Sequence, residues 1–128
     1  GADDYSAVIT NYLKSNGGKF DIVLLGLGED GHTASLFPGS PFVTSQDSVC
    51  FAVKHPTDGT QRVTVGSKDL FNAWRVIYLV KGRSKSEMIK RTIDGKESID
   101  AIPARLYTGR KDETSFLLDS EAASLLQR

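Results

Sequence analysis

Residues 20–39 read FDIVLLGLGEDGHTASLFPG. The nearly continuous apolar run at 20–27 predicts a short strand that is buried on both faces. Strands of this kind usually belong to a parallel sheet flanked by helices. A glycine-rich turn follows at 26–32, and residues 33–37 predict a short helix that ends at Pro38. Strand, turn and helix in this order indicate an α/β fold.

The segments on either side continue this alternation. Residues 5–13 carry apolar side chains at the i, i+3, i+4, i+7 spacing of an amphipathic helix, which Asp3 or Asp4 caps and residues 16–18 end. The same reasoning predicts strands at 49–53, 62–65, 76–80 and 115–118, and helices at 67–73, at 84–93 and after Asp119 or Ser120. Strands alternating with helices predict an α/β sandwich with a mainly parallel sheet, and the pattern leaves the strand order open.

Composition excludes several function classes. The chain has 128 residues, of which 16 are basic and 16 acidic, so no overall field favours nucleic acid or an anionic membrane. Cys50 is the single cysteine, which excludes an internal disulfide framework and fits a reducing compartment. The longest apolar run is too short to span a bilayer, and no signal-peptide pattern is visible. We therefore expect a cytoplasmic protein with no membrane partner.

The glycine-rich turn matches the pattern G-x-G-x-x-G through Gly26, Gly28 and Gly31, which is a dinucleotide-binding fingerprint when a strand precedes it and a helix follows. Two features argue against that interpretation. Glu29 and Asp30 would place carboxylates where a pyrophosphate has to approach backbone amides. The predicted helix after the turn is also too short for a nucleotide-binding unit. We therefore expect no dinucleotide here.

His32 lies at the end of the same turn, and two interpretations are open. A histidine at this point can be purely structural. Loops at the carboxyl ends of parallel strands, however, are where open α/β sheets bind ligands, and a helix start offers free N–H groups to an anion. Histidine titrates at about pH 6.5 when unperturbed, so it can serve as a base near neutral pH. The context favours a functional histidine.

The twenty residues at 20–39 resemble the signature of the 6-phosphogluconolactonases. The related glucosamine-6-phosphate deaminases share the G-x-G-x-D-G-H core but continue with a segment of the type Ile-Ala-Phe-Asn-Glu-Pro, whereas residues 33–38 read TASLFP. Three downstream segments are also similar to the lactonases, namely QRVTV at 61–65, VKGRSK at 80–85 and IPA at 102–104. The Pro-Pro that usually leads into the first of them is replaced by TDGT at 57–60.

The resemblance implies a Rossmann-like sandwich of the NagB/RpiA-like type, with residues 1–128 as the C-terminal part of a single 6-phosphogluconolactonase domain. The phosphate-binding Gly-Gly-Ser loop and the Asp-Glu-Arg segment of that family lie upstream and do not occur in this sequence. The N-terminal half of the same domain is therefore an expected partner. The implied reaction is hydrolysis of a phosphorylated sugar lactone, 6-phospho-D-glucono-1,5-lactone.

The resemblance also implies the roles of individual residues. His32 is the predicted general base, and Asp30 orients its imidazole or the loop. The predicted substrate-binding residues are Gly28, Gly31, Thr33, Arg62 and Lys85. For Lys81 and Arg83, a ligand site and a solvated basic face are equally open, and we interpret His55 as a surface residue.

No cofactor or metal is expected, because His32 and His55 have no Cys, His or acidic neighbour at ligand spacing. A G-x-S-x-G elbow, which would indicate a serine hydrolase, does not occur in the sequence. Two alternatives to lactone hydrolysis stay open. One is a deaminase or isomerase activity on an amino sugar phosphate, and the other is an inactive half-domain that acts as an interaction module.

Overall fold

The computed structural model describes residues 1–127, and its main sheet has three parallel strands. The strands lie in the order β1 (Ile22–Leu25), β4 (Arg75–Val80) and β5 (Thr114–Leu118). Leu24 lies opposite Ile77 on the central strand, and Ile77 lies opposite Ser115. Parallel neighbours need crossover connections, which helices supply here. This arrangement confirms the predicted α/β class.

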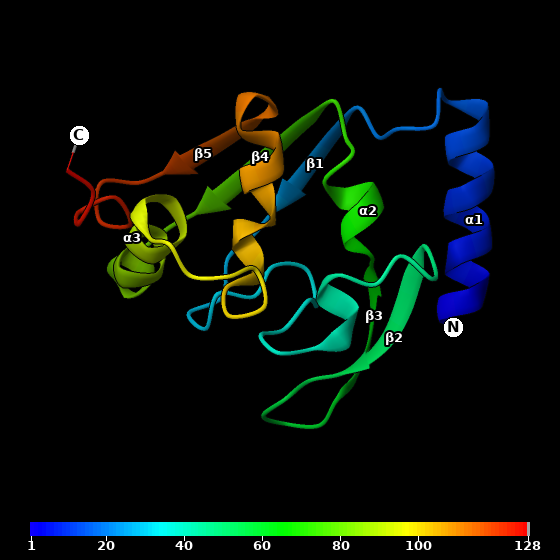
Figure 1. The fold of residues 1–128 in the computed structure, drawn as a ribbon, viewed down its shortest axis with the longest axis horizontal. Coiled ribbons are helices and arrows are strands. Elements are labelled where there is room, and N and C mark those ends of the chain that lie inside the picture. The colour runs from blue at the N-terminus through cyan, green and yellow to red at the C-terminus, as the bar shows by residue number, and fades with distance from the viewer. Residues whose placement is uncertain (128) are drawn as a thin grey trace.

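The strands predicted at 49–53 and 62–65 are present but do not join this sheet. They form β2 (Cys50–Lys54) and β3 (Gln61–Val65), which pair with each other as an antiparallel hairpin. A short connection between two strands allows only antiparallel pairing. The N-terminal helix α1 (Ala2–Ser15) packs on the hairpin through Ile9 and Leu13, which contact Cys50 (Figure 1).

One face of the three-stranded sheet is covered. The covering elements are α3 (Ser86–Asp94) and the 3₁₀ helix η3 (Pro103–Glu113), and η3 lies in front of the strands in Figure 1. Val76, Tyr78 and Ile89 are fully buried between the layers. Burial raises the pKa of the Tyr78 phenol, which therefore keeps its proton and donates a hydrogen bond to the carbonyl of Ala104 at 2.7 Å. This bond joins the sheet to η3.

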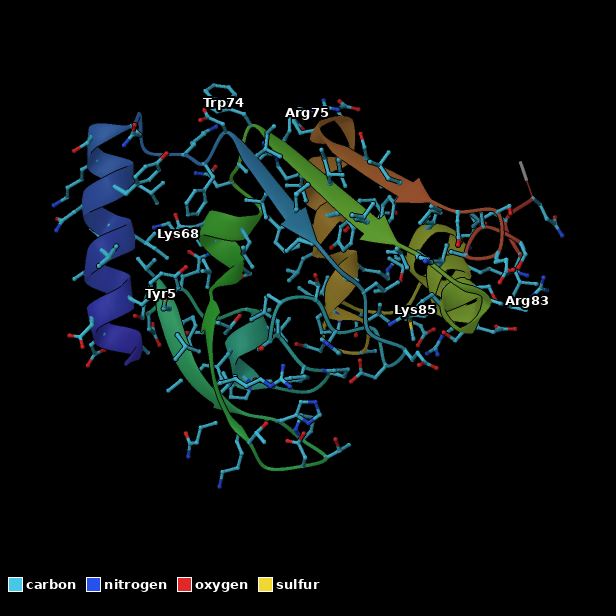
Figure 2. All side chains as sticks on the ribbon, turned by 180° about the vertical axis from the view of Figure 1, so that it is seen from behind. Tyr5, Lys68, Trp74, Arg75, Arg83 and Lys85 are labelled. Atoms are coloured by element: carbon cyan, nitrogen blue, oxygen red, sulfur yellow. The ribbon has the colours of Figure 1, made fainter. Side chains whose placement is uncertain are left out.

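The opposite face of the sheet is open, so the prediction of a strand buried on both sides is wrong for β1. Ile22 is 58% exposed and Leu24 is 66% exposed, and Leu79 of β4 and Leu117 of β5 continue the same apolar face. Figure 2 views the molecule from behind and shows the three strands in front of η3. The described helices that pack on the sheet lie on its other side, so nothing in residues 1–127 covers these side chains.

The remaining elements are short. They are α2 (Ser67–Leu70) and the 3₁₀ helices η1 (Pro41–Val43) and η2 (Arg83–Lys85). The helices predicted at 67–73 and 84–93 are therefore present with shifted bounds, because α2 stops at Leu70 and η2 precedes α3. Across the described residues, no helix is both long and apolar enough to cross a bilayer.

Two predicted helices are absent. Residues 33–36 form a tight turn, in which Leu36 donates to the carbonyl of Thr33 at 3.0 Å and Ala34 has a φ of 51°. The segment is cut short by Pro38, which lacks the N–H that another helical turn would need. The residues after Asp119 also form turns up to residue 125.

Candidate functional site

The glycine-rich loop leaves the carboxyl end of β1 and closes on itself. The amide of Gly28 donates to the carbonyl of His32 at 2.9 Å, and the amide of Gly31 donates to the carbonyl of Gly28 at 3.0 Å. Gly31 has a φ of 94°, a conformation that favours glycine. The closed loop places His32 beside the end of the strand.

A second segment holds this loop from the side. The amide of Ala104 donates to the carbonyl of Gly31 at 3.0 Å. A Cβ atom at Gly31 would lie 3.1 Å from Cγ2 of Ile102, so the two backbones approach closely because residue 31 is glycine. The segment 102–104, which resembles a lactonase segment, therefore supports the loop. It does not line the His32 pocket that is described below.

Asp30 and His32 form a hydrogen-bonded pair. Asp30 Oδ1 lies 2.6 Å from His32 Nδ1 and also accepts from the His32 backbone amide at 3.0 Å. Partial burial alone would raise the pKa of Asp30, but the hydrogen bonds from His32 outweigh it and hold this pKa below the ordinary value. The carboxylate is therefore ionised and can only accept. It follows that, in the neutral imidazole, Nδ1 carries the proton and Nε2 carries the lone pair.

Gly28 makes room for this pair. A Cβ atom at position 28 would overlap Nδ1 and Cε1 of His32 and would lie 2.8 Å from Asp30 Oδ1. The His32 ring thus packs directly against the Gly28 backbone. Any residue larger than glycine at position 28 would prevent this contact. This contact gives the second glycine of the G-x-G-x-x-G pattern a reason that involves no nucleotide.

Thr33 follows His32 and supports the loop. Its side chain is almost fully buried, and its hydroxyl donates to the carbonyl of Gly26 at 2.8 Å. The hydroxyl is thus already engaged, although Thr33 lines the pocket described below. The turn at 33–36 also removes the predicted helix start, so the anion site expected from its free N–H groups is absent.

Lys85 reaches the same place from a distant part of the chain. Its Nζ donates to the carbonyl of Leu27 at 2.6 Å, across 58 positions of sequence. His32 and Lys85 then border one pocket of about 300 Å³, which is lined by Gly26, Leu27, Gly28, His32, Thr33, Ala34 and Lys85. The pocket combines a base with a cation, which is an arrangement that suits an anionic substrate with a carbonyl group.

The turn that carries Lys85 is held by a residue that sequence reasoning did not single out for this role. Asp119 accepts from the amide of Gly82 at 3.0 Å and from the amide of Ala122 at 2.8 Å. Gly82 has a φ of 99°, so the turn depends on glycine as well. Asp119 had been expected only as a helix cap, and no sequence signal links it to the turn at 81–85.

This contact predicts a pH-dependent stability. The hydrogen bonds from the amides of Ala122 and Gly82 lower the pKa of Asp119 from its ordinary value of 3.8. A lowered pKa means that the ionised carboxylate stabilises the folded state above pH 3.8 and that this contribution is lost as the pH falls through the folded-state pKa. Asp119→Asn is expected to lower the thermal unfolding midpoint at neutral pH, and the deficit should shrink below pH 3.8.

The matched control for that experiment is Asp112→Asn, because Asp112 is exposed and has no hydrogen bond among those that the structure shows. Thermal unfolding followed by circular dichroism at several pH values measures both variants. A constant deficit for Asp119→Asn at every pH would contradict the assigned role of its charge.

Three predicted or candidate basic residues do not line the pocket. Arg62 lies on β3 opposite Val53 and is exposed. Lys81 and Arg83 lie in the turn before Lys85, and both are exposed. In the part of the chain that the structure describes, Lys85 is thus the only cation lining the His32 pocket.

His55, which the sequence predicts to be a surface residue, is only partly exposed in the structure. Its side chain is 20% exposed, and its ring lies 5.0 Å from the ring of Phe37, which in turn lies 5.0 Å from the ring of His32. No periodicity or motif pointed to this contact, because His55 follows β2 and lies far along the chain from residues 32–37.

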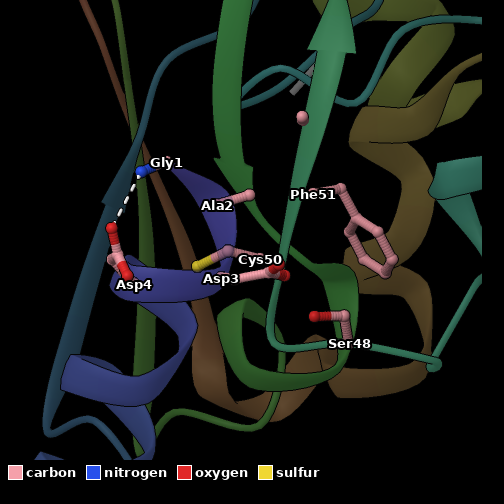
Figure 3. Close-up of a pocket in the computed structure, with 8 residues that line it drawn as sticks. Gly1, Ala2, Asp3, Asp4, Ser48, Cys50 and Phe51 are labelled. Carbon is pink, nitrogen blue, oxygen red and sulfur yellow. Dashed lines mark hydrogen bonds and ion pairs between the residues drawn. The ribbon is translucent and has the colours of Figure 1, made fainter.

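A second pocket lies between the start of α1 and β2 (Figure 3). Asp3 and Asp4 contribute carboxylates to its lining, and Asp4 pairs with the Gly1 amino group at 3.2 Å. Its acidic lining would repel a phosphorylated substrate, and none of the predicted site residues lines it. Within residues 1–127, no cluster of three or more His, Cys, Asp or Glu side chains is arranged to hold a metal ion.

Comparison with known proteins gives one consistent result. The family model described as "Glucosamine-6-phosphate isomerases/6-phosphogluconolactonase" matches residues 1–116. A 6-phosphogluconolactonase of Rattus norvegicus is 37% identical over 84% of this chain and 41% of its own length. One from Haemophilus influenzae is 36% identical over 97% of this chain and 50% of its own length. The chain thus spans about half the length of the curated relatives it matches.

Solved structures agree with these sequence matches. The crystal structure of 6-phosphogluconolactonase from Leishmania guyanensis superposes with a TM-score of 0.83 at 29% identity, covering 99% of this chain and 52% of that one. A monomeric glucosamine-6-phosphate deaminase of the NagB superfamily superposes with a TM-score of 0.75 at 25% identity, covering 96% of this chain and 54% of the other. The similarity extends over the whole α/β arrangement described above.

Proposed function

The chain belongs to the glucosamine-6-phosphate isomerase/6-phosphogluconolactonase family, and on this premise we propose that it contributes the catalytic base of a 6-phosphogluconolactonase. The reaction is hydrolysis of 6-phospho-D-glucono-1,5-lactone to 6-phosphogluconate in the oxidative pentose phosphate pathway, in the cytoplasm. The observation that carries the proposal is the Asp30–His32 pair, which shares one pocket with Lys85.

The proposed first step uses the lone pair of His32 Nε2. Asp30 holds the proton on Nδ1, so Nε2 can take a proton from a water molecule while the water oxygen bonds to the lactone carbonyl carbon. Asp30 also stabilises the imidazolium that forms. The bond between the carbonyl carbon and the ring oxygen then breaks, and the imidazolium returns its proton to that ring oxygen. A lactone is an activated ester, so this route needs no covalent enzyme intermediate.

Lys85 is the group that we assign to the negative charge of the substrate or of the oxyanion. The loop amides are less suited, because those of Gly28 and Gly31 donate to loop carbonyls and that of His32 donates to Asp30. Lys85 Nζ has three donor hydrogens and uses one of them on Leu27. The remaining two can bind an anion in the pocket.

Lys85→Met is expected to raise KM for the lactone by about tenfold to a hundredfold, because a hydrogen bond to a charged group contributes about 1.5–3 kcal/mol. The methionine keeps most of the side-chain length and removes the charge. Steady-state kinetics with a Lys90→Met control test this, since Lys90 is exposed on α3 and away from the pocket lining. An unchanged KM would remove Lys85 from the site.

The uncovered face of the sheet is evidence that another polypeptide segment packs against this chain. We propose that the N-terminal half of the same domain packs there, since the curated relatives are about twice as long and Ile22, Leu24, Leu79 and Leu117 are open to solvent. Mixing the chain with the N-terminal half of the Haemophilus influenzae relative tests this, with lactone hydrolysis as the readout. Turnover that appears only in the mixture would support a divided site, and turnover by the chain alone would contradict it. All kinetic comparisons of variants use the same mixture.

The deaminase activity of the sister group is the second candidate. The superposition with the monomeric glucosamine-6-phosphate deaminase is the observation that favours it. Residues 33–38 argue for the lactonase, because they follow the lactonase segment and not the deaminase one. Lactone hydrolysis, corrected for its spontaneous rate, and ammonia release from glucosamine 6-phosphate are measured in parallel on one preparation. Ammonia release without lactone hydrolysis would overturn the proposed reaction.

A further inference from the structure

Three aromatic rings meet beside the site, two from residues 32–37 and one from the loop of the β2–β3 hairpin. The ring centroid of Phe37 lies 5.0 Å from that of His32 with an interplanar angle of 47°. The Phe37 ring also lies 5.0 Å from the ring of His55 with an angle of 66°. Both separations fall within the range in which aromatic pairs attract each other. His55 belongs to the loop of the β2–β3 hairpin, so the hairpin contacts the catalytic loop through Phe37.

The Asp30 hydrogen bond by itself leaves the His32 ring incompletely fixed. It holds one atom, Nδ1, at 2.6 Å and allows the ring to tilt about that contact. The Gly28 backbone restricts the ring from one direction, as the overlap with an added Cβ atom indicates. The contact with Phe37, which is only 4% exposed, supplies a further restraint on the plane of the ring.

Phe37 is itself held firmly. It packs in a buried cluster with Phe51 and Val53 of the hairpin. On the outer side, His55 is fixed by hydrogen bonds, because its Nδ1 accepts from the Thr57 amide at 3.2 Å. A backbone amide can only donate, so His55 Nδ1 accepts in this hydrogen bond. The loop around His55 is closed by a bond from the His55 amide to the Thr60 carbonyl at 2.9 Å.

The hairpin also holds the turn that follows His32. The Ser35 amide donates to Thr64 Oγ1 at 3.1 Å, and Thr64 is a buried residue of β3. Two independent contacts, one through rings and one through a hydrogen bond, therefore connect the hairpin to the segment that begins at His32.

We propose that Phe37 and His55 are positioning residues for His32, which keep its imidazole in the orientation that presents Nε2 to the pocket. The inference rests on the proposed function for its catalytic meaning. Its structural content, the orientation of His32, stands apart from any reaction. Neither residue contacts the substrate in this assignment, since neither lines the pocket.

The test compares Phe37→Leu and His55→Leu with Phe71→Leu. Phe71 is also buried, but it belongs to the core cluster that contains Val76 and Tyr78 and not to the cluster that holds Phe37. Phe71→Leu therefore matches Phe37→Leu in lost packing without changing the residues that hold the His32 ring. Lactone hydrolysis gives kcat and KM, and long-range ¹H–¹⁵N NMR of the histidine rings reports the tautomer of His32 without any substrate.

For Phe37→Leu and His55→Leu we expect kcat to fall by about tenfold to a hundredfold with KM little changed, as displaced catalytic groups produce. The His32 NMR signals should move from a single Nδ1–H tautomer to a mixture. Phe71→Leu should lower the unfolding midpoint and leave the His32 tautomer unchanged.

His32 signals that stay the same in Phe37→Leu and His55→Leu would overturn the inference, as would equal shifts in all three variants. If Phe37→Leu fails to fold, the His55→Leu variant tests the inference on its own. His55 is partly exposed, so its replacement is expected to leave the protein folded. Failure of the proposed function would be seen differently, as normal hydrolysis by a His32 variant, whereas the NMR result tests the positioning alone.

Discussion

Replacing His32 by asparagine is expected to lower the rate of lactone hydrolysis by about 10²- to 10⁴-fold, the usual contribution of general acid–base catalysis. Asparagine keeps the polarity and much of the size of the side chain but cannot take a proton from water. KM should change little, because the assigned anion-binding group is Lys85. The measurement is kcat and KM on 6-phosphogluconolactone after subtraction of spontaneous hydrolysis.

Asp30→Asn is the companion variant. The side-chain amide of asparagine at position 30 can donate to His32 Nδ1 as well as accept from it. It therefore allows the tautomer in which Nε2 carries the proton. In that tautomer Nε2 has no lone pair with which to accept a proton from water. We expect the Asp30 variant to lose activity as well, and the double variant to lose little more than His32→Asn alone, because the two groups act as a unit. Near-normal turnover by His32→Asn would contradict both the assignment of His32 as the general base and the mechanism that depends on it.

Gly28→Ala is expected to have the second-largest effect, a loss of about 10²-fold in kcat, since a small misplacement of a catalytic group can cost that much. The added Cβ atom would overlap the His32 ring and crowd Asp30 Oδ1 at 2.8 Å. His32 can relieve the overlap only by turning away, which breaks its contact with Asp30. Gly28 does not have a positive φ, so alanine itself is tolerated by the backbone.

The matched control is Gly109→Ala, because no heavy atom lies within 4 Å of a Cβ atom at that position and its φ is not positive. Both variants should unfold at temperatures close to that of the parent chain, and only Gly28→Ala should lose turnover. Equal turnover in the two variants would show that the position of the His32 ring does not depend on the absence of a Cβ atom at residue 28.

Two of the three glycines of the turn have a steric reason to be glycine, and the reasons differ. Gly28 accommodates the imidazole, and Gly31 provides a positive φ and the close approach to Ile102. Gly26 has no neighbour within 4 Å of an added Cβ atom, and its carbonyl accepts from Thr33. The G-x-G-x-x-G pattern is typical of dinucleotide sites, but here its glycines leave room for the His32 ring and shape the loop. The glycine spacing alone is therefore a poor guide to the ligand.

Several features were predictable because they depend on neighbours in the chain. The apolar run of β1, the glycine turn and the pair of Asp30 and His32 lie within eleven residues, where local geometry decides the contacts. The α/β class followed from the alternation of patterns along the chain. The helix predicted at 33–37 failed for a local reason too, since Pro38 left room only for a turn.

The sequence by itself therefore determined the strand, the loop, the pairing of Asp30 with His32 and the family. Only the tertiary structure decided which distant residues join them: Lys85 crosses 58 positions to reach Leu27, Asp119 fixes the turn that carries Lys85, and His55 reaches His32 through Phe37. It alone decided that one face of the sheet is open. Contacts of this kind depend on strand order and on which layers pack together, and hydrophobic periodicity reports the conformation of a segment but not its neighbours in space.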